Sequence, residues 1–364
     1  MSSTEKKHRI IFIDLIRAFA VFQMVQGHTV DALLSESYRN PENIVYATWY
    51  FMRGMTAPIF MFTAGTVFTY LFRVAKGPFS KNVRVVKGIK RGLLLIFLGY
   101  LLRYPTWKLV DFSDVTEYSW NMFFAVDVLH LIGLSLFILL FLFYMSEKIR
   151  LDDYVIIPLT ALVILILSPL FFEIDWESFL PGFIAGYFYE GSGSLFPIFP
   201  WAGYVVAGGV LGSYLARNPM VFKSISFSIY LAVIGIAFIV ASFAVEYISV
   251  LLGNMSEINS ASISLIFLRM GFVLILNSIV SFISLKANSI PKFIILIGRN
   301  TLLIYVVHLV IIYGSAWNPG LYNFFGKSFN GWITFLLAAA MLGLMTIMVL
   351  IDSKLKIRNK ELVT

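Results

Sequence analysis

RIIFIDLIRAFAVFQMVQGHTVD, residues 9 to 31, is an apolar run of helix length that contains Asp14, Arg17 and His28. Ionisable groups inside a membrane span are costly and commonly mark a functional site. At about 100° per residue, Arg17 and His28 fall within roughly 20° of each other on the helix wheel, and Asp14 lies about 40° away. The stretch therefore predicts a transmembrane helix with one polar face, which is turned away from lipid.

The composition of the whole chain is that of an integral membrane protein. Of the 364 residues, 59% are hydrophobic and only 13% are charged, and the mean hydropathy is +0.85. No segment is long and polar enough for a separate domain, so we expect one transmembrane domain over residues 1–364, with cytoplasmic tails at about 1–9 and 353–364. The absence of cysteine excludes disulfides, thiolate nucleophiles and cysteine-based metal sites.

Apolar segments recur along the chain at the length that spans a bilayer. A window of about 20 residues finds ten of them, of which 88–103 and 154–172 are the weakest, because they are short or bounded by Pro105, Pro158 and Pro169. The ten ranges are 10–33, 45–72, 88–103, 120–145, 154–172, 196–216, 225–250, 262–285, 293–314 and 330–352. The expected fold class is all-α, a polytopic bundle of about ten transmembrane helices.

The loops between these ranges alternate in charge, which assigns them to opposite sides of the membrane. Basic residues gather before the first helix, in residues 73–91 and in alternate later loops, whereas loops such as 31–42 and 111–117 are acidic. Lys and Arg favour the cytoplasmic side, so both termini are predicted to be cytoplasmic. This bias also explains the formal charge of +8, and nucleic acid is not an expected partner.

Further ionisable side chains recur inside the other predicted helices. At about 1.5 Å of rise per residue, they fall in the outer half of the membrane or near its middle, as His28 does. Each charge alone in hydrocarbon would cost at least ~2.5 kcal/mol, so we expect them to share one cavity. They are Arg53, Asp127, His130, Arg269 and His308.

Structural roles are an alternative for several of these residues. His28 could merely cap the outer end of its helix. Asp14 and Arg17, at positions i and i+3, could form a structural ion pair. Asp127 could orient His130 for catalysis, or the two could form a packed polar contact. The sequence pattern is the same in each case.

The predicted helix at 196–216 carries a smooth face made of glycines. Prolines interrupt its start, and small residues then allow close approach by a neighbouring helix or by a ligand. The commoner cause of such a face is helix packing. The glycines are Gly203, Gly208, Gly209 and Gly212.

Five stretches of the chain together resemble a known family. The first helix carries D-L-x-R and M-x-x-x-H, formed by Asp14, Arg17, Met24 and His28. The others are APIFMFTAG (57–65), DVLHLIGLSL (127–136), FPIFPWAGYVVAGGVLG (196–212) and IGRNTLLIYVVHLVIIYG (297–314). They are similar to the transmembrane acyltransferase superfamily, in the branch of heparan-alpha-glucosaminide N-acetyltransferase and its bacterial relatives. This chain departs from the family in having His130 where glutamine is often found.

The resemblance implies transfer of an acyl group, acetyl from acetyl-CoA, to a hydroxyl or amine of an extracytoplasmic glycan or small-molecule acceptor. His28 is the expected general base, and Asp127, His130 and His308 are further catalytic candidates. Direct transfer and an acyl-histidine intermediate both fit these residues. The candidates for donor or substrate binding are Asp14, Arg17, Arg53, Trp201, Arg269, Arg299 and Asn300.

The donor is expected to thread in from the cytoplasm, with its phosphates near the basic inner loops and its thioester reaching toward His28. The expected setting is the cytoplasmic membrane of a bacterium or archaeon, with membrane lipid as a partner and no metal. A homodimer is compatible with the sequence. The rival functions are a secondary transporter, for which no duplicated pattern of broken helices is found, and an exporter of an acylated glycan.

Overall fold

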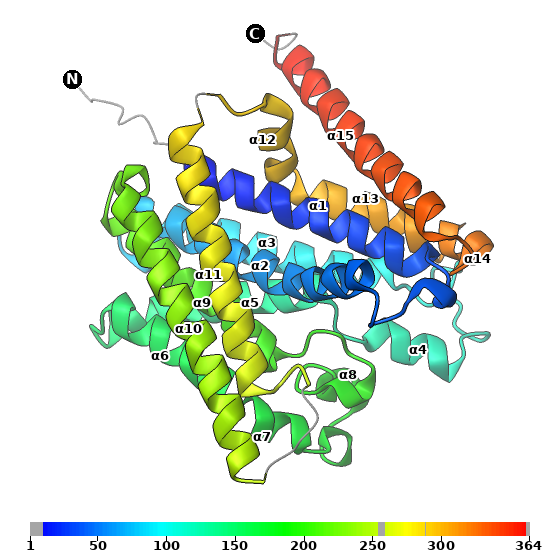
Figure 1. The fold of residues 1–364 in the computed structure, drawn as a ribbon, viewed down its shortest axis with the longest axis horizontal. Helices are drawn as coiled ribbons and strands as arrows, with labels where there is room; N and C mark the ends of the chain where they lie inside the picture. The colour runs from blue at the N-terminus through cyan, green and yellow to red at the C-terminus, as the bar shows by residue number, and fades with distance from the viewer. Residues whose placement is uncertain (1–9, 254–258, 288, 362–364) are drawn as a thin grey trace.

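A computed structural model describes residues 10–253, 259–287 and 289–361, and within them the chain is all-α apart from one short hairpin (Figure 1). The predicted all-α class is therefore confirmed. The helices are α1 (Ile11–Leu33), α2 (Ile44–Val74), α3 (Val83–Leu102), α4 (Glu117–Phe124), α5 (Val128–Lys148), α6 (Asp153–Ile166), α7 (Ser168–Glu173), α8 (Gly182–Ala185), α9 (Ile198–Arg217), α10 (Ile225–Leu251), α11 (Ile263–Lys286), α12 (Lys292–Arg299), α13 (Thr301–Tyr313), α14 (Leu321–Phe325) and α15 (Gly331–Glu361). The hairpin pairs β1 (Gly314–Ser315) with β2 (Asn318–Pro319).

Each of the ten predicted ranges is helical, but ten membrane spans are not shown. Within the described residues, six helical stretches are long and apolar enough to cross a membrane, or seven if the bent pair α12 and α13 counts as one span. The six are α2, α4 with α5, α9, α10, α11 and α15. Charged and polar side chains keep α1 and α3 out of this group, and α6 is shorter than the others.

Three of the predicted helices are divided in the structure. The range 120–145 breaks after Phe124, because Asp127 adopts an extended conformation and its side chain accepts from the first N–H of α5. The range 154–172 divides at Leu167 into α6 and α7. The range 293–314 bends by 78° at Asn300, between α12 and α13.

The ends of the chain were expected to be short cytoplasmic tails, and the structure shows only the conformation of the C-terminal one. The helix α15 continues to Glu361, so the segment from 353 onward is helical as far as the structure describes it. The expected tail at 1–9 and residues 362–364 lie outside the described residues.

The glycines of α9 serve helix packing, because α2 lies against Gly208, Gly209 and Gly212 and α6 lies against Gly203. A Cβ atom on Gly208 would lie 1.9 Å from the carbonyl oxygen of Phe62, and one on Gly65 would lie 1.8 Å from that of Val205. The hydroxyl of Thr66 donates to the carbonyl of Gly208 at 3.0 Å across the same contact. Of the two predicted explanations for this smooth face, close helix packing is the one observed.

The first helix lies at the centre of the contacts that build the site. It packs along α12, α13 and α15 and touches α2 and α11 (Figure 1). Residues all along α1 are buried, including Phe12, Ile16, Val25 and Leu33. The polar side chains of α1 consequently face neighbouring helices.

Candidate active site

Two histidines face each other across α1 and α13. Nδ1 of His28 lies 3.0 Å from Nε2 of His308, and the rings are stacked with an interplanar angle of 11°. Nδ1 of the buried His308 lies 2.7 Å from the carbonyl oxygen of Ile304. A carbonyl only accepts, so this nitrogen carries the hydrogen. With both rings neutral, Nε2 of His308 then accepts from Nδ1–H of His28, and Nε2 of His28 keeps its lone pair.

The C-terminal end of α1 continues this polar region beyond His28. The Tyr313 ring lies edge-on to the His28 ring, and its hydroxyl donates to the His28 carbonyl at 3.4 Å. Asp31 forms an ion pair with Arg53 and lies 3.9 Å from Arg39. Arg53 therefore neutralises a carboxylate one turn from the histidine pair.

Asp127 and His130 interact in the reverse of the predicted sense. The imidazole Nδ1 of His130 accepts from the backbone N–H of Asp127 at 3.1 Å, so the carboxylate does not orient this ring. The carboxylate instead accepts from the Tyr305 hydroxyl at 3.3 Å and lies 3.5 Å from Nη2 of Arg103. This geometry matches the alternative of a packed polar contact at the start of a helix.

His130 is enclosed by its neighbours. The ring is completely buried, and a Cβ atom on Gly99 would lie 2.6 Å from it. The Tyr100 ring packs edge-on at 4.3 Å between centroids. Nδ1 of His130 accepts a backbone N–H, and Nε2 is buried without a hydrogen-bond partner among the described residues.

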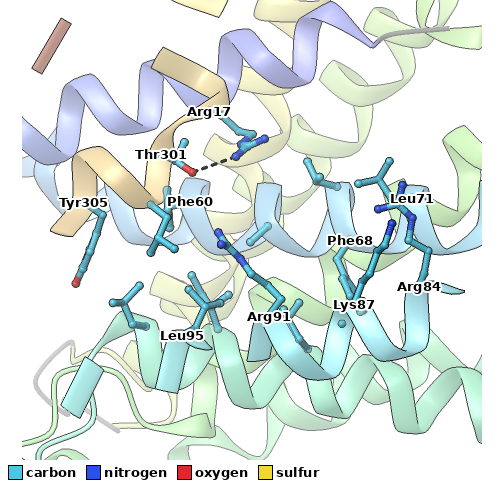
Figure 2. Close-up of a pocket in the computed structure, with 17 residues that line it drawn as sticks. Arg17, Phe60, Phe68, Leu71, Arg84, Lys87, Arg91, Leu95, Thr301 and Tyr305 are labelled. Atoms are coloured by element: carbon cyan, nitrogen blue, oxygen red, sulfur yellow. Dashed lines mark hydrogen bonds between the residues drawn. The ribbon is translucent and has the colours of Figure 1, made fainter. Parts of the chain in front are cut away.

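A cavity of about 240 Å³ lies between α1, α2, α3, α5 and α13 (Figure 2). Most of its lining is aliphatic or aromatic, and its cationic groups come from α1 and α3. Figure 2 shows Tyr305 toward one end and Lys87 and Arg84 toward the other. The Tyr305 ring also packs edge-on against His308, at 5.8 Å between centroids. The cavity thus leads from basic side chains to the neighbourhood of the histidine pair.

Asp14 and Arg17 have different partners, both near the break between α12 and α13. Nη2 of Arg17 donates to the Thr301 hydroxyl at 3.0 Å, on the wall of the cavity. The Asp14 carboxylate lies 3.8 Å from Nε of Arg299. The Asn300 side chain donates to the carbonyl of Leu296 at 2.9 Å, which closes the end of α12.

The remaining predicted site residues lie apart from the histidine pair. Arg269 on α11 lies over the ring of Trp201 on α9, with its Cζ atom 5.0 Å from the ring centroid. Neither residue lines the cavity. The single cavity expected for the buried charges is not observed. Arg53, Asp127, His130, Arg269 and His308 all lie outside the lining of the cavity of about 240 Å³, as does His28, and Arg269 forms a separate group with Trp201.

Sequence reasoning missed several residues of the site, among them Thr301, Tyr305 and Arg103. Thr301, Tyr305 and His308 occupy positions i, i+4 and i+7 of one helix. This spacing could have placed all three on one face of α13. Arg103 follows the last residue of α3, and no local pattern connects it with Asp127. In the part of the chain that the structure describes, no three His, Asp or Glu side chains are grouped to hold a metal ion.

The family model for the catalytic part of heparan-alpha-glucosaminide N-acetyltransferase matches residues 9–239. The chain belongs to this family. The resemblance seen in the sequence is confirmed, and membership indicates a membrane acetyltransferase. The match includes His28 and Asp127 but ends within α10, before the helix that carries His308. None of the curated proteins compared with the chain matches it.

Proposed function

We propose that this protein transfers an acetyl group from acetyl-CoA to a hydroxyl or amine of an extracytoplasmic acceptor, with His28 as general base. The observation that carries this proposal is the chain of contacts from Ile304 through His308 to His28. It leaves Nε2 of His28 as a proton acceptor held in a fixed orientation. The family name points to an amine on a glucosaminide, and a glycan or a similar small molecule is the acceptor class we propose.

The reaction needs only one proton acceptor at this position. Nε2 of His28 takes the proton of the acceptor as its oxygen or nitrogen attacks the thioester carbonyl. The tetrahedral intermediate then expels the sulfur of CoA, and the imidazolium returns the proton to that sulfur. The buried ring of His308 holds His28 in the required tautomer throughout, as orienting groups do for catalytic histidines.

The cavity supports entry of the donor from the cytoplasmic side. Arg84, Lys87 and Arg91 line it from α3, and Arg17 lines it from α1. Arginine and lysine bind phosphate oxygens through charge-assisted hydrogen bonds, so these residues would hold the phosphates of CoA. The apolar remainder of the lining suits the pantetheine arm, whose thioester would arrive beside Tyr305 and the histidine pair.

The remaining carboxylates are assigned to positioning. Asp14 holds Arg299 and thereby fixes α12 on α1. Asp127 caps the start of α5, accepts a hydrogen bond from Tyr305 and forms an ion pair with Arg103. His130 is assigned to the same structural contact, because its Nδ1 accepts a backbone hydrogen bond.

The proposed topology has ten membrane crossings and both termini in the cytoplasm. In addition to the apolar stretches, α1, α3 and the pair α6 with α7 would cross, because their polar side chains face protein or the cavity. The alternating Lys and Arg content of the loops supports this orientation. The His28 end of α1 is then on the outer side and the Arg17 end on the inner side.

The experiment that tests the function is acetyl-CoA turnover by protein purified into lipid nanodiscs. Wild-type protein should release free CoA thiol at a rate that rises with added amino sugars or other small polar acceptors. His28→Ala should lose the activity about 10²- to 10⁴-fold while CoA still binds, because removing a base leaves the binding groups in place. His8→Ala changes a histidine of the N-terminal segment and is the control. Normal turnover by His28→Ala would exclude His28 as the base.

A further inference from the structure

A second group of buried polar side chains lies between α9 and α11 and plays no part in the proposed reaction. It consists of Trp201 and Tyr204 on α9 and Arg269 on α11. The Arg269 guanidinium lies 5.0 Å from the centroid of the Trp201 ring, and the Trp201 and Tyr204 rings are 5.9 Å apart. The Arg269 guanidinium also lies within hydrogen-bonding range of the Tyr204 hydroxyl and its charge acts on the phenol, but the geometry is not that of a formed hydrogen bond. The three side chains therefore form one cluster, here called the α9–α11 cluster.

The polar atoms of this cluster are buried without hydrogen-bond partners. They are Nε1 of Trp201, the hydroxyl of Tyr204, and Nε and Nη1 of Arg269, none of which has a partner among the described residues. Trp201 is 6% exposed and Tyr204 is fully enclosed. Buried polar groups are nearly always hydrogen-bonded in native proteins, so four such atoms in one place indicate a missing partner.

The chemistry of the cluster specifies that partner. A guanidinium and an indole N–H only donate, and guanidinium stays protonated in proteins. A water molecule could accept from two of these groups, but it would leave the charge of Arg269 uncompensated. An anion satisfies the donors and the charge together.

The position of the cluster on α9 adds a further attraction for negative charge. The backbone of Phe199 is extended, so the regular helix begins at Pro200. Trp201 and Tyr204 then lie in the first two turns, where the helix dipole is positive. The enclosure of the atoms favours a small ligand that accepts hydrogen bonds from any direction.

We infer that the α9–α11 cluster binds a small monovalent anion of the halide class, such as chloride. The anion accepts from Arg269, Trp201 and Tyr204 and joins α11 to the start of α9. This inference is independent of the proposed acetyl transfer. Its consequence is a protein whose stability depends on the kind of anion present, separately from ionic strength.

The test measures the thermal unfolding midpoint of the protein in zwitterionic nanodiscs by calorimetry. Sodium chloride or bromide replaces sodium gluconate at constant ionic strength. Wild-type protein should gain stability saturably, by about 5 °C at a hundredfold excess over the dissociation constant. Arg269→Met should abolish this gain. Tyr204→Phe and Trp201→Phe keep the cation and remove one donor each, so each should raise the half-saturating concentration about tenfold.

A matched control is available in Arg217, which lies over the Tyr154 ring at 4.3 Å but is paired with Asp152. Arg217→Met should unfold at a lower temperature and keep the full halide response. The inference is overturned if wild-type protein responds equally to gluconate and chloride, or if the response follows the content of anionic lipid. An unchanged response in Tyr204→Phe and Trp201→Phe would also overturn it, even where Arg269→Met does not fold.

Discussion

Nδ1 of His28 and Nε2 of His308 lie 3.0 Å apart, although 280 positions separate the two residues along the chain. One belongs to the first helix and the other to α13, so the contact exists only once the bundle has closed. The carbonyl of Ile304 fixes the hydrogen on the far side of His308. Three groups in series therefore decide which nitrogen of His28 can accept a proton.

His308 should act through His28 rather than on the substrates. We expect His308→Ala to lower kcat about 10²-fold with little change in the affinity for CoA, because His28 loses the partner that selects its tautomer. His308→Gln should recover part of the rate, since a glutamine amide can both donate to Ile304 and accept from His28. Steady-state kinetics with isothermal titration of CoA make the measurement. Equal loss in both variants, with weaker CoA binding, would contradict a positioning role.

Arg17 should contribute to donor affinity. We expect Arg17→Gln and Lys87→Gln each to weaken CoA binding about tenfold, because both side chains line the cavity. Lys90 lies on α3, as Lys87 does, but does not line the cavity, so Lys90→Gln is the control. Isothermal titration in detergent measures the affinities. If Asp14→Asn combined with Arg17→Gln restores normal affinity, the two residues act as a structural pair and the donor route is wrong.

Gly208 should tolerate no side chain. We expect Gly208→Ala to destabilise the protein by about 1–3 kcal/mol, because the new methyl group would meet the carbonyl of Phe62. Gly54→Ala in α2 is the matched control, since nothing lies within 4 Å of its would-be Cβ, and it should be neutral or stabilising by up to about 1 kcal/mol. Thermal unfolding compares them. Equal midpoints for both variants would show that the α2–α9 contact adjusts freely.

The absence of cysteine from the chain allows a clean test of topology. Ser80→Cys in the basic second loop should react with a membrane-impermeant maleimide only after the membrane is opened. Ser37→Cys in the acidic first loop should react in intact cells, because that loop is proposed to face outward. Gel mobility of the labelled protein gives the readout. Labelling of the Ser80→Cys variant in intact cells would show that the proposed orientation is wrong.

The helices could be predicted from the sequence because hydropathy is a local property. Residues 10–33, 225–250 and 262–285 were predicted within one or two positions of α1, α10 and α11. The breaks at Asp127 and Asn300 were not predicted, since the apolar run continues on both sides of each. The Asp127 carboxylate divides the first of these helices by capping the start of α5, and the chain bends by 78° between α12 and α13.

The sequence predicted individual residues of the site better than it predicted which residues contact each other. The polar face of α1 was correctly placed against protein, and Arg17 does line a cavity. The partner of Arg17 is Thr301, and Arg299 lies against Asp14, because α12 and α13 pack along α1. Spacing within one helix allowed a pair between Asp14 and Arg17 as one of two alternatives. Which distant helix lies beside α1 is decided by the order of helices in the bundle, and no local pattern reports it.

The bend at Asn300 places two short helices of different direction against the same face of α1. The side chains of α12 and α13 that contact α1 all come after residue 239, where the family match ends. A fragment that stops there would keep the proposed base but leave Arg17 and His28 without Thr301 and His308. If His308 orients His28 as proposed, the smallest active unit is longer than the segment that the family model recognises. On the same proposal, two co-expressed fragments divided between α11 and α12 would have to reassemble before acetyl-CoA could be turned over.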